Sequence, residues 1–131
     1  MKEHLVSVVM PAYNAENFIK EAIESILFQT FSDFEFIIIN DASTDSTESI
    51  IKSFSDPRIR LIKNEKNLGL TKSLNIGFEL AKGKYIARMD ADDISLPERF
   101  QKQFDFMEKN LNIDILSTWA SRSDGVILIP P

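Results

Sequence analysis

The spacing of apolar residues switches repeatedly between two periods along this chain, and that alternation limits the possible folds more than any other feature. Short continuous apolar runs rich in β-branched residues predict strands buried on both faces. Stretches in which apolar residues recur every three or four positions predict amphipathic helices. The predicted strands are residues 6–10, 34–40, 59–63 and 85–89, and the predicted helices are residues 16–29, a short segment from 45, 70–81 and 96–110. This order predicts an α/β fold with three layers, a mostly parallel sheet and right-handed crossovers.

Individual residues mark several of the expected helix ends. Asp45 and Glu48 have the spacing of a capping box, which predicts the start of the short helix. Gly83 is a good terminator for the helix at 70–81, and Pro97 suits the first turn of the helix at 96–110.

The end of the chain differs from the rest. Residues 113–119 and 126–129 predict two further strands around a turn at 123–125. No element follows to cover the last of them. We therefore expect the chain to be cut from a longer protein, or to complete itself as a homodimer through this C-terminal strand.

The scarcity of two residue types excludes several kinds of chemistry. The chain has no cysteine and a single histidine, His4. Disulfides, thiolate nucleophiles, Ser-His-Asp catalysis and multi-histidine metal centres are therefore excluded, and any metal must be held by oxygen ligands. Against 20 acidic residues there are 15 lysines and arginines, giving a net charge of −5, which argues against a nucleic-acid partner.

The length of 131 residues suits one domain, so we expect residues 1–131 to form a single unit. The longest apolar runs, at 36–39 and 126–129, are far shorter than the ~20 residues of a membrane-spanning helix. Residues 5–10 are also too short for the apolar part of a signal peptide. We expect a soluble, cytoplasmic protein.

Polar residues follow three of the predicted strands at the point where each strand ends. Tyr13 and Asn14 follow the first strand, Asp41 follows the second, and the acidic run at 90–93 follows the fourth. Ligands of open α/β sheets bind at the carboxyl ends of the strands, where the strand order reverses. If the order is 3-2-1-4, these residues share one cleft.

The residues that this cleft lacks indicate its ligand. Neither GxGxxG nor GxxxxGK[ST] occurs, so no glycine-rich cradle for a pyrophosphate is expected. Asp90, Asp92 and Asp93 would repel a phosphate unless a cation lay between them. Mg²⁺ or Mn²⁺ removes this conflict, because carboxylates and substrate phosphates are its usual ligands. Its charge would also stabilise a departing diphosphate.

Each of these residues also has a purely structural interpretation. Asp92 or Asp93 could cap the following helix, and Asp41 could form an Asx turn. Tyr13 could be a half-exposed aromatic residue, and Arg88 could be an ion-pair partner for the acidic loop. The convergence of separate loops on one sheet edge favours the functional interpretation.

Five ordered motifs together resemble the family 2 glycosyltransferases, which have the Rossmann-like GT-A fold. They are VSVVMPAYN at 6–14, ILFQTF at 26–31, INDASTD at 39–45, NLG at 67–69 and ARMDADDISLPER at 87–99. The resemblance runs from residue 6 to about residue 119. It implies that a sugar is transferred with inversion from a nucleotide-sugar, often a UDP-sugar, to a polysaccharide or cell-surface glycan.

The same resemblance implies a nucleoside pocket. Pro11, Ala12 and Tyr13 would line it, with the Tyr13 ring against the base. Asp41 would accept a hydrogen bond from the base imide, which favours uracil or thymine. The loop that borders the nucleotide would contain Asn67 and Gly69.

For the diphosphate, the resemblance implies Asp92 and Asp90 as ligands of Mn²⁺ or Mg²⁺, with Asp90 also near the ribose. Many relatives carry arginine where this chain has Leu74. We therefore expect Arg88 or Lys72 to contact the diphosphate instead.

The family's acceptor-binding half, with its acidic general base, has no counterpart after Trp119. Such a base contributes roughly 10²- to 10⁴-fold to the rate, so the catalytic base stays unknown and the chain is expected to be weak or inactive alone. We expect the donor-binding part of a longer transferase, whose glycan or lipid-linked acceptor could draw it to the inner face of the membrane.

Two functions of other classes stay open. One is a catalytically inactive module that binds nucleotide or only self-associates. The other is a phosphatase with an aspartyl nucleophile, because Asp-x-Asp after a strand also serves that chemistry. The downstream lysine and acidic pair of such phosphatases are not found.

Overall fold

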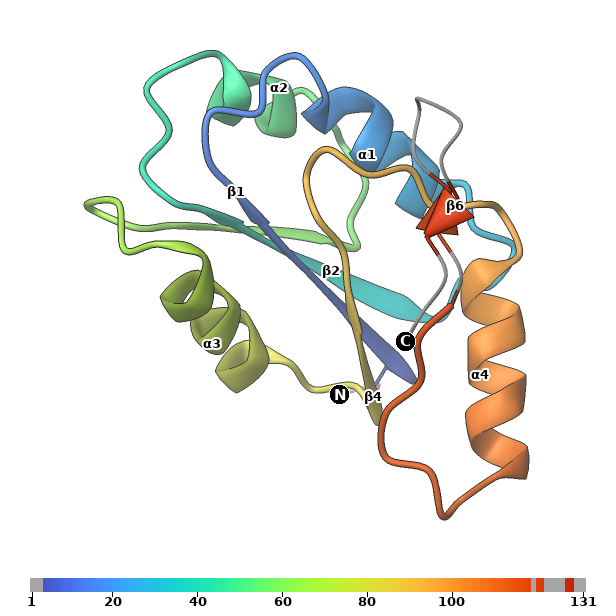
Figure 1. The fold of residues 1–131 in the computed structure, drawn as a ribbon. Helices are drawn as coiled ribbons and strands as arrows, with labels where there is room; N and C mark the ends of the chain where they lie inside the picture. Colours follow the sequence, from blue (N-terminus) through green and yellow to red (C-terminus); the bar gives the residue numbers. More distant parts are fainter. Residues whose placement is uncertain (1–3, 119, 122–126, 129–131) are drawn as a thin grey trace.

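The computed structural model describes residues 4–118, 120–121 and 127–128. Its main sheet has four parallel strands in the order β3-β2-β1-β4, and Figure 1 shows helices on both sides of it. The strands are β1 (Val6–Ala12), β2 (Phe34–Asn40), β3 (Ile59–Lys63) and β4 (Tyr85–Arg88). The helices are α1 (Ile19–Leu27), α2 (Thr47–Lys52), α3 (Leu70–Leu80) and α4 (Arg99–Lys109). The predicted three-layer α/β fold and strand order are confirmed.

The side chains of β1 alternate between two helix layers. Val8 and Met10 are fully buried in the core that α1, α2 and α4 share, whereas Val9 contacts α3 on the other face. Gly77 lets α3 approach closely, because a Cβ there would lie 2.3 Å from Val9 Cγ1. Cover on both faces explains why the strands are continuously apolar.

The expected capping box of α2 is not formed. Asp45 Oδ1 accepts a hydrogen bond from the Thr47 N–H at 2.9 Å, but Glu48 does not reach back to the helix start. Its carboxylate instead pairs with Lys52 at 2.5 Å and Lys63 at 2.6 Å. Hydrogen bonds to these two ammonium groups lower the pKa of Glu48 to about 2. Glu48 therefore ties α2 to β3.

Gly83 serves close packing and does not end a helix. The helix α3 stops at Leu80, and Gly83 lies against β1, where a Cβ would be 2.5 Å from the Ser7 backbone nitrogen. The fully buried Ser7 Oγ accepts hydrogen bonds from the N–H groups of Lys82 at 3.1 Å and Gly83 at 2.7 Å. Ser7 thus fastens the loop that enters β4.

The predicted strand at 113–119 is wrong over residues 113–118, which have no regular structure. Leu111 and Ile115 are exposed, so no sheet face covers this segment. A separate antiparallel pair joins β5 (Ala120–Ser121) to β6 (Ile127–Leu128). The turn at 123–125 lies outside the described residues, and pairing of two copies through the final strand stays a prediction.

Within the part of the chain that the structure describes, none of the helices combines the length and apolar character needed to cross a bilayer.

Candidate functional site

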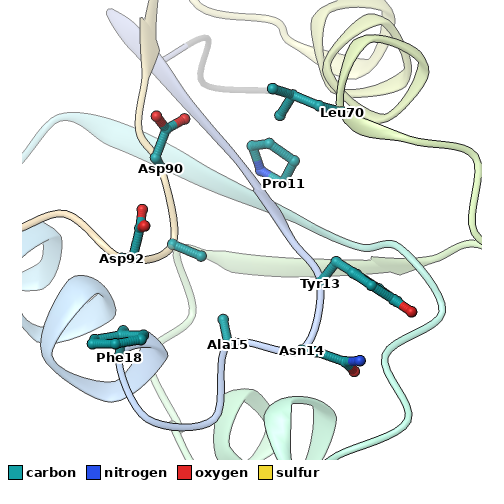
Figure 2. Close-up of a pocket in the computed structure, with 9 residues that line it drawn as sticks. Pro11, Tyr13, Asn14, Ala15, Phe18, Leu70, Asp90 and Asp92 are labelled. Atoms are coloured by element: carbon teal, nitrogen blue, oxygen red, sulfur yellow. The ribbon is translucent and has the colours of Figure 1, made fainter.

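A two-lobed cleft lies at the carboxyl end of β1, beside the point where β1 and β4 stop pairing. Its lobes have volumes of about 350 and 310 Å³ and share Pro11, Tyr13 and Leu70. The first, called the Asp41 lobe, is lined by Pro11, Ala12, Tyr13, Asp41, Asn67, Gly69, Leu70 and Ser73. The second, called the acidic lobe, is lined by Pro11, Tyr13, Asn14, Ala15, Phe18, Leu70, Asp90, Ala91 and Asp92, and Figure 2 shows it.

Asp41 directly follows β2, and its buried carboxylate is held by three donors. Oδ1 accepts hydrogen bonds from Asn64 Nδ2 and the Leu68 N–H, both at 2.8 Å. Oδ2 accepts one from the Gly69 N–H at 2.9 Å. Asn64 is also hydrogen-bonded to Ser73 Oγ at 3.1 Å, which fixes its amide. The carboxylate is therefore fixed in orientation.

Two opposing effects act on the pKa of Asp41. Burial raises the pKa, while the hydrogen bonds from Leu68, Asn64, Gly69 and Ser73 lower it. The hydrogen bonds together outweigh burial, and the pKa lies below its ordinary value of 3.8. Asp41 is thus ionised at neutral pH and acts only as an acceptor.

The loops that follow β1 and β2 brace each other beside the Asp41 lobe. Asn14 Oδ1 accepts a hydrogen bond from the Thr44 N–H at 2.8 Å, and the Asn14 N–H donates to Ser43 Oγ at 3.1 Å. Asn14 and Ala42 have positive φ values of 46° and 58°. These contacts set the position of Tyr13, which is half-exposed between the lobes.

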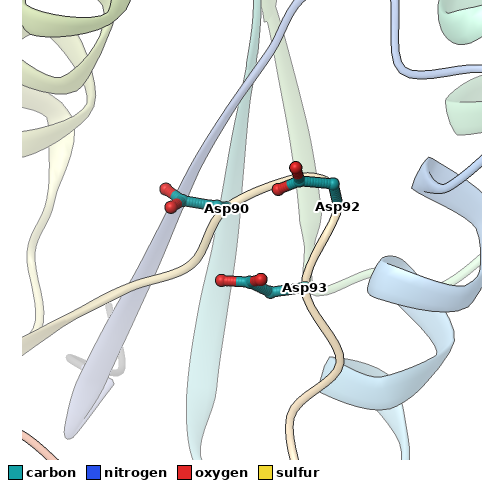
Figure 3. A group of neighbouring side chains, drawn as sticks. All are labelled: Asp90, Asp92 and Asp93. Atoms are coloured by element: carbon teal, nitrogen blue, oxygen red, sulfur yellow. The ribbon is translucent and has the colours of Figure 1, made fainter. Parts of the chain in front are cut away.

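Three carboxylates gather at the other end of the cleft. One carboxylate oxygen from each of Asp90, Asp92 and Asp93 lies within 4.8 Å of the other two. Figure 3 shows the three side chains on their shared loop. Burial raises the pKa of Asp93, and the charges of Asp90 and Asp92 raise it further. Hard oxygen donors crowded in this way fit Mg²⁺ or Mn²⁺, because a divalent cation would offset their mutual repulsion.

Two arginines lie next to this cluster without lining the cleft. Arg88 forms an ion pair with Asp90 at 3.2 Å, and both side chains stay largely exposed. The ion pair expected between Arg88 and the acidic loop is therefore present. Burial lowers the pKa of Arg99, and the charge of Asp93 partly offsets that effect. Arg99 Nη2 donates to the Arg88 carbonyl at 3.1 Å, joining α4 to the end of β4.

The structure brings most of the predicted site residues together. Those in the cleft are Pro11, Ala12, Tyr13, Asp41, Asn67, Gly69, Asp90 and Asp92, whereas Arg88 and Lys72 are not among its lining residues. The helix-cap interpretation of Asp92 and Asp93 is wrong, because α4 begins only at Arg99, with Glu98 at its cap position. The Asx interpretation of Asp41 is wrong too, since Asn40 Oδ1 accepts the Ser43 N–H.

Sequence reasoning missed several residues of the site. Asn64, Leu68 and Ser73 hold or support Asp41. Asp93 is predicted in the acidic run but not among the metal ligands, and the structure places its carboxylate in the cluster with Asp90 and Asp92. Nothing in the sequence could identify the Leu68 N–H as a donor, because every non-proline residue carries one.

The model of the family described as "Glycosyl transferase family 2" matches residues 7–130 of this chain. The chain belongs to this family. An uncharacterized glycosyltransferase of Methanocaldococcus jannaschii is 52% identical over 124 residues, which are 92% of this chain and 43% of that protein. The UDP-Glc:alpha-D-GlcNAc-diphosphoundecaprenol beta-1,3-glucosyltransferase WfgD of Escherichia coli is 39% identical over 110 residues, 84% of this chain and 44% of that protein. Membership of this family argues against the aspartyl phosphatase.

Solved structures agree with the fold. S. aureus TarS 1-349 in complex with UDP-GlcNAc matches with a TM-score of 0.77 and 28% identity, over 81% of this chain and 32% of that one. Mannosyltransferase PcManGT from Pyrobaculum calidifontis, in complex with GDP-Man and Mn²⁺, matches with a TM-score of 0.65 and 26% identity, over 72% and 29%. The GT-A fold is confirmed. The chain spans less than half the length of these four proteins.

Proposed function

We propose that this chain binds the nucleotide-sugar donor of an inverting glycosyltransferase, with a UDP-sugar lying along the cleft. The base occupies the Asp41 lobe and the diphosphate reaches the acidic lobe. The observation that carries this proposal is a pair of adjoining lobes that share Pro11, Tyr13 and Leu70, with a fixed carboxylate acceptor at one end and a carboxylate cluster at the other.

Hydrogen-bond accounting supports uracil as the base. A carboxylate offers about four acceptor positions; Asp41 accepts hydrogen bonds from Asn64, Leu68 and Gly69, and the Ser73 hydroxyl also lowers its pKa by hydrogen bonding. A donor such as the N3–H of uracil would compete with the Ser73 hydroxyl, which lines the same lobe, for the last position. Cytosine offers an acceptor at N3, which a carboxylate would repel, so it should bind more weakly. Tyr13, half-exposed beside this lobe, offers its ring face for stacking.

The crowded carboxylates support a metal-dependent diphosphate site. Asp90, Asp92 and Asp93 would hold Mn²⁺ or Mg²⁺, which supplies Lewis-acid stabilisation of the charge on a departing diphosphate. Their negative charge alone would repel the diphosphate. The Mn²⁺ in the PcManGT complex supports the same choice of ion.

The acceptor and the general base belong to the whole transferase. The WfgD relative is named for an acceptor linked to diphosphoundecaprenol, which supports a lipid-linked glycan acceptor. We propose that such an acceptor draws the transferase to the inner face of the membrane. The β linkage in that name supports inversion, because glucose is α-linked in UDP-Glc. The carboxylates that line the cleft in the described part of the chain are Asp41, Asp90 and Asp92, all assigned to the donor. We propose that the catalytic general base comes from outside residues 1–131.

Isothermal titration of the chain with UDP tests this proposal, with Mn²⁺, Mg²⁺ or EDTA present and with CDP and GDP as comparison ligands. We expect saturable UDP binding that the metal strengthens and weaker binding of CDP. Absence of UDP binding under every condition would contradict the proposal.

Replacing one carboxylate distinguishes the contribution of the metal to UDP binding from the contribution of the nucleobase. In Asp92→Ala, UDP is expected to bind as weakly with Mn²⁺ as with EDTA, whereas uridine, which lacks the diphosphate, binds as it does to the parent. Asp105→Ala, an exposed carboxylate on α4, is the matched control and should behave as the parent. An unchanged metal response in Asp92→Ala would refute the metal assignment.

A further inference from the structure

A buried glutamine lies behind the acidic loop, outside the cleft. Gln29 follows the end of α1, and its side chain is only 6% exposed. It is 66 residues away in sequence from Ser95, yet the two side chains are hydrogen-bonded at 3.2 Å. The motif ILFQTF that contains Gln29 has no role in the donor contacts proposed above.

Every polar atom of the Gln29 side chain is engaged with a fixed partner. Nε2 donates to the Ser25 carbonyl at 3.1 Å, to Ser95 Oγ at 3.2 Å and to the Leu96 carbonyl at 2.7 Å. Oε1 accepts the Phe100 N–H at 3.0 Å. Glutamine is suited to this place because its amide both donates and accepts, whereas glutamate would turn an acceptor oxygen toward two carbonyls.

Neighbouring contacts strengthen the same junction. The Thr30 N–H donates to the Pro97 carbonyl at 2.9 Å, and the Ser95 N–H donates to Ser25 Oγ at 3.0 Å. Residues 95–100, where the acidic loop leaves the site, are therefore bound to the end of α1. The other end of this loop is fixed to β1, because the Met89 N–H donates to the Val9 carbonyl at 3.0 Å.

Between these two fixed ends, the three aspartates are exposed or half-buried and repel one another. A loop in this state would separate its carboxylates unless its ends were held at a set distance. This repulsion opposes cation binding only if the loop is free to move and lets the carboxylates separate.

We propose that Gln29 is a positioning residue that holds the acidic loop so that Asp90 and Asp92 stay close enough to share one divalent cation. The inference rests on the proposed function for the identity of this ligand. Gln29 itself touches neither the cleft nor the carboxylates. It acts by fixing the exit of the loop to α1, whose preceding turn supplies Ala15 and Phe18 to the same lobe.

Hydrogen exchange in the full 131-residue chain tests the positioning directly. The variant is Gln29→Leu, which replaces the amide by an apolar side chain of similar size. We expect the Phe100 and Ser95 amides to exchange at least about tenfold faster, while amides of β1 and β2 keep the parent rate. Uniformly faster exchange would mean that Gln29 contributes only to overall stability, and would overturn the proposal.

Titration with UDP tests the consequence for the metal. The measured quantity is the ratio of the UDP dissociation constants in EDTA and in Mn²⁺, so that a change in the base site cancels. Residues that support metal ligands typically change metal affinity by about 10- to 100-fold, so we expect the ratio to fall at least about tenfold in Gln29→Leu. Uridine should bind the variant as it binds the parent.

The matched control is Ser7→Ala. Ser7 is also a buried polar residue that fastens a loop, but at the opposite end of the sheet. Its loss should speed exchange at Lys82 and Gly83 and leave the Mn²⁺ ratio unchanged. Ser25→Ala removes the hydrogen bond from the Ser95 N–H and a local one from Ser25 Oγ to the Ala22 carbonyl, and it gives a milder second variant in case Gln29→Leu does not fold.

The outcomes separate this inference from the proposed function. If the parent gains no affinity from Mn²⁺, the proposed function and this inference both fail. If the parent gains affinity and Gln29→Leu and Ser25→Ala gain as much, only the role of Gln29 is refuted. A selective loss in the Gln29 variant, absent from Ser7→Ala, supports it.

Discussion

The two lobes of the cleft hold their carboxylates in opposite ways. In the Asp41 lobe, one buried carboxylate is surrounded by donors from the protein, and its pKa is lowered. At the acidic lobe, oxygens of the lining residues Asp90 and Asp92 and of the adjacent Asp93 lie within 4.8 Å of one another, and the pKa of Asp93 is raised by burial and by its neighbours. The Asp41 carboxylate has hydrogen-bond donors within the protein, while the acidic cluster has an excess of negative charge.

This difference shows what each end can accept. Under the proposed function, a carboxylate held by hydrogen bonds would recognise a neutral donor by geometry. The crowded cluster would instead take a cation, and an anionic group only through that cation. Both ends use aspartate, so the surrounding backbone, rather than the residue type, determines the two roles.

Replacing the carboxylate at each end should affect stability very differently. Asp41→Ala leaves the Leu68 and Gly69 N–H groups without their acceptor, and hydrogen bonds to a charged group contribute about 1.5–3 kcal/mol each. We expect the free energy of unfolding to fall by about 3 kcal/mol or more. Asp92 is exposed, so Asp92→Ala should change it by less than about 0.5 kcal/mol. Urea denaturation measures the loss of unfolding free energy in both variants, and equal losses would contradict the expected difference.

Addition of Mn²⁺ should stabilise the protein through the acidic lobe alone. At ten times its dissociation constant, a cation that binds only the folded state adds about 1.4 kcal/mol to the free energy of unfolding. The gain should vanish with EDTA and in Asp92→Ala, and persist in Asp105→Ala. Thermal unfolding with and without Mn²⁺ measures it, and a gain retained in Asp92→Ala would place the ion elsewhere.

Glycine substitutions next to Asp41 and in the acidic loop should change the free energy of unfolding in opposite directions. Ala42, next to Asp41, has a φ of 58°, a conformation that costs an L-residue roughly 1–2 kcal/mol. Glycine removes this cost but adds unfolded-chain entropy of about 0.4–1 kcal/mol, leaving Ala42→Gly a net gain of roughly 0.5–1 kcal/mol. Ala91→Gly, at a position without positive φ, should lose a similar amount. Denaturation midpoints decide the signs, and a loss in Ala42→Gly would show that the conformation is unstrained.

Acid should reduce the stability difference between the parent and Asp41→Ala. Because the folded-state pKa of Asp41 lies below 3.8, its contribution is fully present above that value and is lost as the pH falls through the folded-state pKa. Glu48, with a pKa of about 2, contributes equally to both proteins and cancels. Urea denaturation at pH 6 and at pH 3 measures the difference, and a gap that widens in acid would contradict the lowered pKa.

Much of the Asp41 lobe and the strand order could be predicted from the sequence, because period and position at strand ends are local signals. Asp41 and Tyr13 come directly after apolar strands, and parallel pairing brings such positions to one edge. The partners of Asp41 could not be predicted, because two of them are backbone N–H groups of a loop 27 and 28 residues away.

Where local signals failed, contacts distant in sequence replaced them. Glu48 has the spacing of a capping box, but Lys63 of the neighbouring strand competes for its carboxylate. Gly83 resembles a helix terminator, but the close approach of β1 is what requires it. The segment at 113–118 has apolar residues without a sheet to join, and apolar residues alone do not make a strand.

Pro11 occupies the point where the sheet divides. Along β1, the backbone groups of Leu5 and Val9 face β4, and Pro11 follows in the same alternation, two residues after the last pair between these strands. Any other residue would direct an N–H there, where β4 has already turned away. Proline leaves the floor shared by both lobes without that donor. A molecule in the cleft therefore finds no backbone donor at Pro11, between the two lobes. The chemical difference between the two ends of the cleft then determines the orientation in which the molecule binds.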